Sequence, residues 1–161
     1  MNKPSSVQVS LKLPFVELAG TWAPDEAERN AAWEMYVELI TRVAVVELAP
    51  DEGSLREALN ALYSLFASTR EILRRYGPAV ARPSRGSELS FGAIAIAVLN
   101  QGLRPLLTKW HPELAAYEAT RPPDVSPIEH ERAWSANQQL RTQLATLRER
   151  LSEYARALMS R

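Results

Sequence analysis

The chain is organised around LRTQLATLRERLSEYARAL, residues 140–158, whose apolar residues recur in steps of four and three. This is the spacing of a heptad seam, which keeps one face of a helix apolar along its length. A row of this length needs an apolar groove, supplied by the rest of the chain or by a partner. The seam residues, which we interpret as an interaction surface, are Leu140, Leu144, Leu147, Leu151, Tyr154 and Leu158.

The helix that carries the seam is expected to begin at Ser126 and to run unbroken to about Met159. In Ser126-Pro127-Ile128-Glu129, the serine and the glutamate can satisfy each other's backbone N–H groups, and the proline takes the first helical position, where no N–H is needed. Such a helix spans roughly 50 Å, against roughly 35 Å for each of the first two helices. An overhang of about 15 Å is therefore expected to contact a partner.

Composition restricts the classes of function. A chain of 161 residues suits one domain. Lys and Arg (19) balance Asp and Glu (19), so no net field attracts nucleic acid, which is not an expected partner. The absence of cysteine excludes disulfides, thiolate metal sites and a thiol nucleophile. Since no signal peptide is evident and no apolar run approaches the roughly 18 residues of a membrane span, we expect a cytoplasmic protein without membrane contact.

The N-terminal segment has the pattern of a strand. Residues 7–13 alternate apolar and polar side chains and stop at Pro14. The strand has no obvious partner, so it is interpreted as an extended arm over the helices; pairing with a short second strand, or with another chain's sheet edge, is the alternative. Residues 15–23 are expected to be a connector that attaches Phe15 and Trp22 to the core. This divides the chain into an arm, residues 1–23, and a helical domain, residues 24–161.

Two helices should follow the arm. The first begins near Pro24-Asp25-Glu26, where acidic residues favour the positive end of the helix dipole. The second begins with a capping box at Ser54 and Glu57 and ends at Gly77, which suits the left-handed position past a helix end. The last turns of the first helix are rich enough in β-branched residues to form a strand instead. The apolar stripe expected to bury the first helix is Trp33, Tyr36, Val37, Ile40, Val43, Ala44 and Leu48.

The third helix is predicted to occupy the centre of the domain. It begins at about Ser87, and residues 91–99 are apolar all round, which is typical of a helix at the centre of a bundle, although their alternation also fits a strand. Pro105 should kink or restart this helix, and Pro112 should begin a further short helix, residues 112–120. The predicted fold is all-α: an antiparallel four-helix bundle with a kinked third helix, a long C-terminal helix and the N-terminal extended arm.

One pair of residues resembles a catalytic motif. Arg104 and His111 are separated by six residues, and this spacing resembles the Arg-x(4–6)-His motif of HEPN-type RNases. The resemblance implies a helical domain that dimerises to pair two motifs, with the arginine steadying the scissile phosphate and the histidine taking part in proton transfer. Pro105 departs from the family, which favours a polar residue after the arginine. Without that function, His111 is expected to cap the helix that Pro112 starts.

No metal or cofactor is expected. The carboxylate metal sites of helical bundles use Glu-x-x-His, but Thr108 and Pro127 stand three residues before the two histidines, His111 and His130. His130 and the following Glu131 lack the second histidine of a zinc-protease helix. The sequence also contains neither the Gly-x-Ser-x-Gly turn of serine hydrolases nor a glycine-rich phosphate loop. If the chain is an enzyme at all, the RNase is the candidate.

Two further groups of residues have a structural and a functional interpretation. Arginines near the end of the second helix and in the loop after it either form an anion-binding site or are a solvated helix end stabilised by the dipole. The tryptophans are expected in the core rather than in a ligand cage. The arginines are Arg70, Arg74, Arg75, Arg82 and Arg85, and the tryptophans are Trp22, Trp33, Trp110 and Trp134.

The sequence therefore supports three hypotheses about function. The first is a non-enzymatic helical interaction module that binds another protein or itself through the C-terminal seam and the N-terminal strand. The second is the RNase that uses Arg104 and His111. The third is a small-ligand binder with a pocket near the Pro105 kink, lined by Trp110, Asn100 and Gln101.

Overall fold

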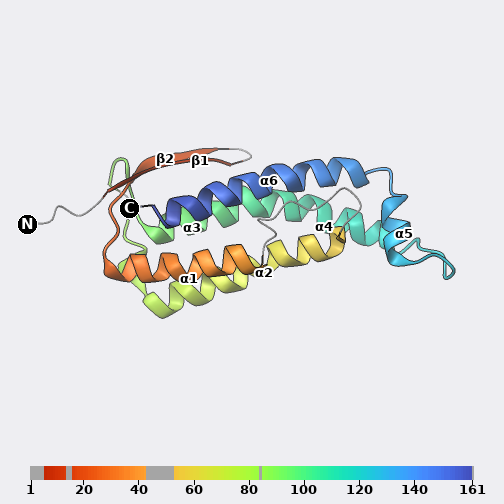
Figure 1. Ribbon diagram of the computed structural model, residues 1–161, viewed down its shortest axis with the longest axis horizontal. Coiled ribbons are helices and arrows are strands. Elements are labelled where there is room, and N and C mark those ends of the chain that lie inside the picture. Colours follow the sequence, from red (N-terminus) through yellow and green to blue (C-terminus); the bar gives the residue numbers. More distant parts are fainter. Residues whose placement is uncertain (1–5, 14–15, 43–52, 84, 161) are drawn as a thin grey trace, which may run out of the picture.

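The computed structural model describes residues 6–13, 16–42, 53–83 and 85–160 (Figure 1). The elements α3, η2 and α4 follow one another as one helical rod beside α6, while α1 and α2 run beneath them and a hairpin lies along α6 (Figure 1). The described elements are β1 (Val7–Lys12), β2 (Glu17–Trp22), α1 (Glu26–Arg42), α2 (Leu55–Tyr76), η1 (Pro78–Val80), β3 (Glu88–Leu89), α3 (Phe91–Ala97), η2 (Val98–Leu103), α4 (Arg104–Glu118), α5 (Pro127–Arg132) and α6 (Asn137–Leu158).

The prediction of an all-α four-helix bundle is wrong, because the N-terminal strand belongs to a small mixed sheet. β1 pairs with β2 in antiparallel register from Val7↔Trp22 to Lys12↔Glu17, and β2 pairs with β3 in parallel through Thr21↔Glu88. The segment that was predicted to be a connector therefore contains β2. Its sequence, ELAGTW, lacks the alternation that marks β1, so it has no clear strand signal of its own.

The glycine in β2 has a specific packing role. A Cβ atom at Gly20 would lie 2.3 Å from the backbone oxygen of Ser87 and 2.8 Å from Cγ of Leu89. No side chain fits in that space, so only glycine lets β3 approach β2 this closely. Thr21 uses this approach, since its backbone N–H donates to the Ser87 oxygen at 2.8 Å.

Helix ends with local signals lie where the sequence predicts them. Ser54 accepts a hydrogen bond from the Glu57 N–H and begins α2, and Gly77, at φ +73°, ends it while its N–H donates to the Leu73 oxygen at 2.9 Å. α1 begins at Glu26 as expected. The predicted continuation of α1 toward Leu48, and the strand alternative there, fall at residues 43–52, outside the described residues.

The third helix is interrupted by a π-helical turn. α3 begins at Phe91, with the Ser90 hydroxyl accepting from the Ala93 N–H at 3.1 Å, and it is a helix rather than a strand. In η2 the Arg104 N–H donates to the Leu99 oxygen, five residues back, directly before Pro105. α-Helical geometry therefore resumes at Arg104, with Pro105 in the first turn of α4, which agrees with the predicted restart of the helix.

Pro112 does not begin a new helix, which corrects the prediction of a separate helix at residues 112–120. It lies inside α4, which continues to Glu118. A proline in a helix interior removes one backbone hydrogen bond. The buried side chains Trp110 and Leu114 hold the turns on either side of Pro112 against the core.

The C-terminal helix is also divided. Ser126 caps α5 as predicted, accepting from the Glu129 N–H at 3.1 Å, but the chain leaves the helix after Arg132 and resumes it at Asn137. The side-chain amide of Asn137 donates to the backbone oxygen of Glu131 at 2.9 Å. Trp134, which lies between the two helices, stacks on Tyr117 with the ring centres 5.3 Å apart. These contacts fix the turn, so α6 alone is shorter than the predicted helix.

Two buried glutamates join elements that are distant in the sequence. Glu28 of α1 accepts from the Phe91 N–H at 3.1 Å, where α3 begins. Glu131 of α5 accepts from the Leu55 N–H at 2.8 Å, where α2 begins. Each carboxylate satisfies a backbone donor at a helix N-terminus, where the dipole favours negative charge.

Candidate functional site

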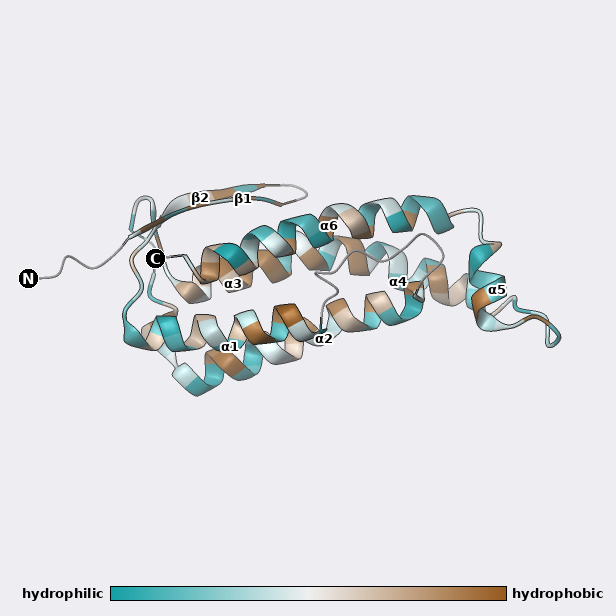
Figure 2. Cartoon of the chain, viewed as in Figure 1, coloured by the Kyte–Doolittle hydropathy of each residue, from teal (hydrophilic) through white to brown (hydrophobic). Residues whose placement is uncertain are grey.

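The predicted heptad seam is covered by the chain's own residues. Leu140 is 0%, Leu151 1% and Tyr154 2% exposed, and Leu147 and Leu158 are also buried; Leu144 is partly buried against the same core. α1 and β1 contact α6 and supply the cover. Figure 2 shows that the outward side of α6 is largely hydrophilic. The premise that this row extends beyond its own fold is therefore not met, and the seam offers no surface to a partner.

The apolar stripe of α1 differs from the prediction in the opposite direction, because residues predicted to be buried are exposed. Trp33 and Ile40, which belong to the stripe predicted as core, are exposed, with relative accessible areas of 55% and 44%. The rings of Trp33 and Tyr36 stack with centroids 5.8 Å apart, and Tyr36 and Val37 are partly buried. A second row on the same helix faces the core instead and consists of Glu28, Ala31, Ala32, Met35 and Leu39.

The other tryptophans confirm the prediction of a structural role. Trp22 and Trp110 are 1% exposed, and Trp134 is partly buried against the core. The Trp110 Nε1–H donates to the Gln143 oxygen at 2.8 Å, which ties α4 to α6. The Trp22 Nε1–H approaches the Glu28 carboxylate at 3.4 Å.

Arg104 and His111 share one face of α4, turned toward α2. Seven residues in a helix are about two turns, or roughly 10 Å along the axis. The Arg104 guanidinium lies 4.9 Å from the ring centre of Phe66, and its Nε–H donates to Asn100 at 3.2 Å. The Nδ1 atom of His111 lies 2.8 Å from the Arg56 guanidinium. Each of the two residues therefore has its own partner on α2, and they do not meet each other.

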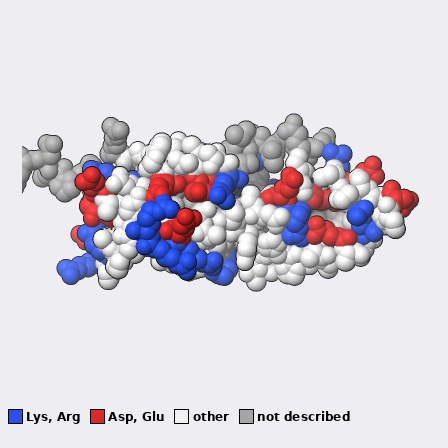
Figure 3. Space-filling model, turned by 90° about the horizontal axis from the view of Figure 1, so that it is seen from below, with Lys and Arg blue, Asp and Glu red and all other residues white. Residues whose placement is uncertain are grey.

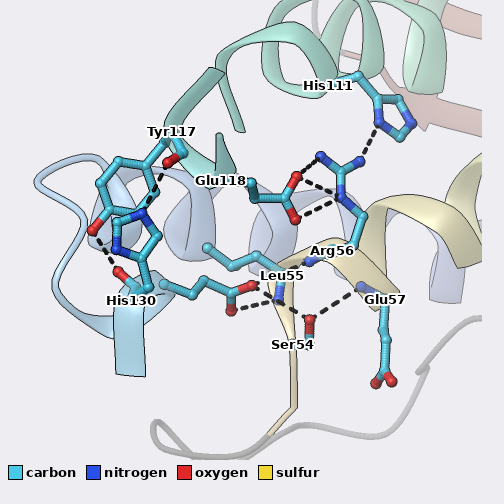
Figure 4. Close-up of polar contacts among 9 residues, drawn as sticks. Ser54, Leu55, Arg56, Glu57, His111, Tyr117, Glu118 and His130 are labelled. Carbon is cyan, nitrogen blue, oxygen red and sulfur yellow. Dashed lines mark hydrogen bonds and ion pairs between the residues drawn. The ribbon is translucent and has the colours of Figure 1, made fainter. Parts of the chain in front are cut away.

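Arg56 determines the chemistry of His111. It also binds Glu118, with its Nη2 2.6 Å from the carboxylate, so that it lies between two residues of α4 (Figure 4). Since a guanidinium only donates, Nδ1 of His111 must accept, and the neutral ring then carries its proton on Nε2. Burial, followed by the positive charge of Arg56, lowers the pKa of His111 below its ordinary 6.5, and Glu118 partly opposes this. His111 can donate a hydrogen bond from Nε2, but it cannot accept a proton there while the Arg56 contact holds.

The expected capping role of His111 is wrong, since it lies inside α4. His130 has a separate structural role, since its ring stacks on that of Tyr117 with the ring centres 3.9 Å apart. Its Nε2 lies 2.8 Å from the backbone oxygen of Tyr117, and the hydroxyl of Tyr117 donates to the backbone oxygen of His130 at 2.5 Å (Figure 4). Within the described residues, no group of three or more His, Asp or Glu side chains could hold a metal ion.

The predicted anion-binding arginines do not converge on one point. Arg75 is bound to Glu34 and, at 3.1 Å, to Glu71, and Arg82 is bound to the buried Glu28 at 3.0 Å. Arg70 and Arg74 line a shallow hollow together with Ala67 and Glu71, and Arg85 is exposed in a loop. Figure 3 shows basic and acidic side chains interleaved on this face. This arrangement fits the solvated helix end better than an anion site.

An open cavity of about 530 Å³ lies beside Pro105, where the third hypothesis expected a pocket. Its lining differs from the prediction. Trp110 is turned into the core toward Gln143, while Asn100 and Gln101 are exposed outside the lining. The described lining residues are Lys12, Leu13, Gly102, Pro105, Leu106, Lys109, Thr142, Gln143, Thr146, Leu147 and Arg150.

The segment Phe91–Glu118 is long and apolar enough, by length and composition alone, to cross a membrane. Half of its most apolar window is buried in the fold. A helix at the centre of a globular core passes the same test. The predicted cytoplasmic location and lack of membrane contact remain predictions.

Comparison with known proteins gives no match: no protein-family model, no curated protein and no solved structure is similar to this chain.

Proposed function

We propose that the chain is a non-enzymatic interaction module that pairs with a second copy of itself through α1. The contact surface is the α1 stripe, defined as Trp33, Tyr36, Val37 and Ile40. This replaces the C-terminal seam, which the fold covers, as the surface for assembly. The exposure of Trp33, which has a relative accessible area of 55%, is the observation that carries the proposal.

The α1 stripe differs from isolated exposed hydrophobic residues, which are normal on protein surfaces. Its members follow one another at helical spacing, and Trp33 and Tyr36 are stacked and therefore already ordered before binding. Tryptophan and tyrosine are the residues most often found to dominate binding energy at interfaces. An ordered aromatic pair loses little conformational entropy when a partner covers it.

A second copy fits this stripe because the stripe is self-complementary. In a two-fold, antiparallel pair of α1 helices centred between Tyr36 and Val37, the large Trp33 of each copy would lie opposite the smaller Ile40 of the other. Such a pair also opposes the two helix dipoles, which is favourable. Two-fold dimers built from one patch on both subunits are the commonest oligomers.

The test is light scattering after size exclusion, over a range of protein concentrations. The wild-type chain should form a dimer, and Trp33→Glu should be monomeric at the same concentrations while keeping the wild-type circular dichroism spectrum. Ile128→Glu is the matched control, because Ile128 is also an exposed hydrophobic residue but lies on α5; it should remain dimeric. A monomeric wild type, or a Trp33→Glu variant that dimerises normally, contradicts the proposal.

The RNase alternative has one favourable observation, since Arg104 and His111 face the same side of α4. Catalysis would require His111 to exchange a proton. The environment works against this, because burial and then the charge of Arg56 lower the pKa of His111, and the Arg56 contact engages one of the two ring nitrogens. For this reason the interaction module is preferred.

A further inference from the structure

We propose that the cavity beside Pro105, called here the Pro105 cavity, binds an amphipathic organic anion: an apolar body that carries a carboxylate or phosphate head group. This goes beyond the proposed dimer, because the cavity lies between α4, α6 and the end of β1 and shares no residue with the α1 stripe.

Four elements, η2, α4, α6 and the end of β1, form the walls of the cavity. Gly102, Pro105 and Lys109 recur at helical spacing along η2 and α4, so they lie on one face. From α6, Thr142, Gln143, Thr146, Leu147 and Arg150 likewise share one face and line the opposite wall. Lys12 and Leu13, at the end of β1, close the third side.

The π-helical turn explains why a cavity exists here. At Pro105 the missing N–H and the bulk of the ring prevent a regular helix, and the Arg104 N–H reaches back five residues to Leu99. Gly102, in this turn, adds no side chain: a Cβ atom there would already be 3.4 Å from the Leu13 side chain. A larger residue at 102 would therefore enter the cavity. Turns of this kind are frequent at functional sites.

The cavity has an apolar floor and a basic, polar rim. Gly102, Leu106 and Leu147 are buried and form the floor. Lys12 and Lys109, on the exposed rim, have no ion pair within the described part of the chain, and the third cation, Arg150, has a long one, 3.3 Å from Glu153. The described lining includes no carboxylate. This combination favours a ligand whose body is apolar and whose head is negative.

The three cations and the amide of Gln143 give the rim its hydrogen-bond donors, whereas the hydroxyls of Thr142 and Thr146 donate to backbone oxygens and offer only acceptors. The oxygen of the Gln143 side chain already accepts from Trp110 at 2.8 Å, so the amide nitrogen is the group that Gln143 can offer to a ligand. The hydroxyl of Thr146 donates to the Thr142 backbone oxygen, which leaves its oxygen as an acceptor. Lysine and arginine only donate. A carboxylate or phosphate, which accepts, suits this rim better than an amine.

The size of the cavity is also appropriate. Its volume of about 530 Å³ lies within the roughly 300–1,000 Å³ of small-molecule sites. Because the cations are partly exposed to solvent, each adds only a small amount to binding. The apolar body should therefore supply most of the affinity, and the head group should supply the selectivity.

The experiment uses the whole chain and four ligands with the same eight-carbon tail: nonanoate, octyl phosphate, octanol and octylamine. Titration calorimetry should show that at least one of the two anions binds roughly tenfold more tightly than octanol, because three weak charge contacts add together. Octylamine should bind more weakly than octanol. The tighter of the two anions identifies the head group. NMR shifts of the backbone amides should be centred on Thr142 and Thr146.

Matched variants separate the two parts of the site. Lys109→Gln combined with Arg150→Gln leaves Lys12 as the one cation of the described lining, so it should remove most of the preference for the anion but keep octanol binding. Arg156→Gln, which removes an exposed cation of α6 outside the cavity, should change neither. Thr146→Trp, at an exposed rim position, should fill the cavity and abolish binding of all four ligands. Equal affinity for octanol and the two anions, no binding of either anion, or shifts centred elsewhere overturn the proposal.

Discussion

The helices α1 and α6 both carry apolar residues at helical spacing, yet their surroundings differ. On α6, Leu140 and Leu151 are almost completely buried, whereas on α1, Trp33 and Ile40 expose about half of their surface. The sequence predicts the reverse, a core stripe on α1 and a partner surface on α6. An apolar row on a helix therefore shows that something must cover the row, but it does not show whether the cover comes from the same chain.

The covering elements explain the difference. β1 lies along α6 as part of a hairpin, so the groove that the seam needs is supplied partly by strands (Figure 1). The break between α5 and α6 comes before Leu140, so the whole row lies within α6 and the predicted long helix, with its overhang, does not form. On α1, the buried row includes Ala31 and Ala32, whose small side chains let neighbouring elements pack closely. This row therefore faces the core, and Trp33 remains on the outside.

The largest expected effect compares the two rows directly. Leu151→Ala on α6 should lower the free energy of unfolding by about 2–5 kcal/mol, because it leaves a cavity in a packed core. Trp33→Ala on α1 should change the same quantity by only about 0.5 kcal/mol when measured on the monomer at high dilution, because it removes an exposed side chain. Urea denaturation measures both. Equal losses for the two variants would mean that the α1 stripe is also part of the core.

Much of the fold could be predicted where the signal was local. Ser54, Gly77 and Ser126 each mark a helix end through contacts with residues three or four positions away, and all three lie where the sequence places them. The strand β1 could be recognised from its alternation. Its partner β2 could not, because ELAGTW has no clean period and its glycine is required by the approach of β3, a segment far along the chain.

The candidate sites were predicted less well, because they depend on contacts between distant segments. The position of the cavity followed from Pro105, but its lining did not, because the π-helical turn changes which residues face α6. His111 was expected to act as a cap or as a catalyst, and nothing near it in the sequence indicates that Arg56 engages its Nδ1. Likewise, no local pattern shows that Glu131 caps a helix that begins at Leu55.

The second-largest expected effect concerns the contact between Glu131 and the Leu55 N–H, which connects α5 to α2 and thereby helps to position α6. Glu131→Gln should lower the free energy of unfolding by about 1–3 kcal/mol, because the amide loses the charge and one acceptor that the N–H groups of Leu55 and Arg56 use. Glu129→Gln, at an exposed position of the same helix, is the control and should have a smaller effect. Equal effects in urea denaturation would show that Glu131 does not position α5 against α2.

The smallest expected effect is the pH dependence due to His111. Because its pKa in the folded chain lies below the ordinary 6.5, the unfolded chain binds more protons just below that pH. Stability should therefore decrease as the pH falls from 6.5 toward the folded-state pKa, and His111→Gln should remove this part of the decrease. An NMR titration of the ring should give a pKa below 6.5 and a neutral form protonated on Nε2.

The Arg56→Gln variant shows whether the contact between Arg56 and His111 sets the pKa and the tautomer of the histidine. Loss of the positive charge should raise the pKa of His111, because the remaining neighbour, Glu118, favours the protonated ring. If the wild-type titration instead gives a pKa of 6.5 or above, or a neutral ring protonated on Nδ1, then Arg56 does not hold His111 in the donor state. His111 would then be free to exchange a proton, and the RNase hypothesis would regain the group that its chemistry requires.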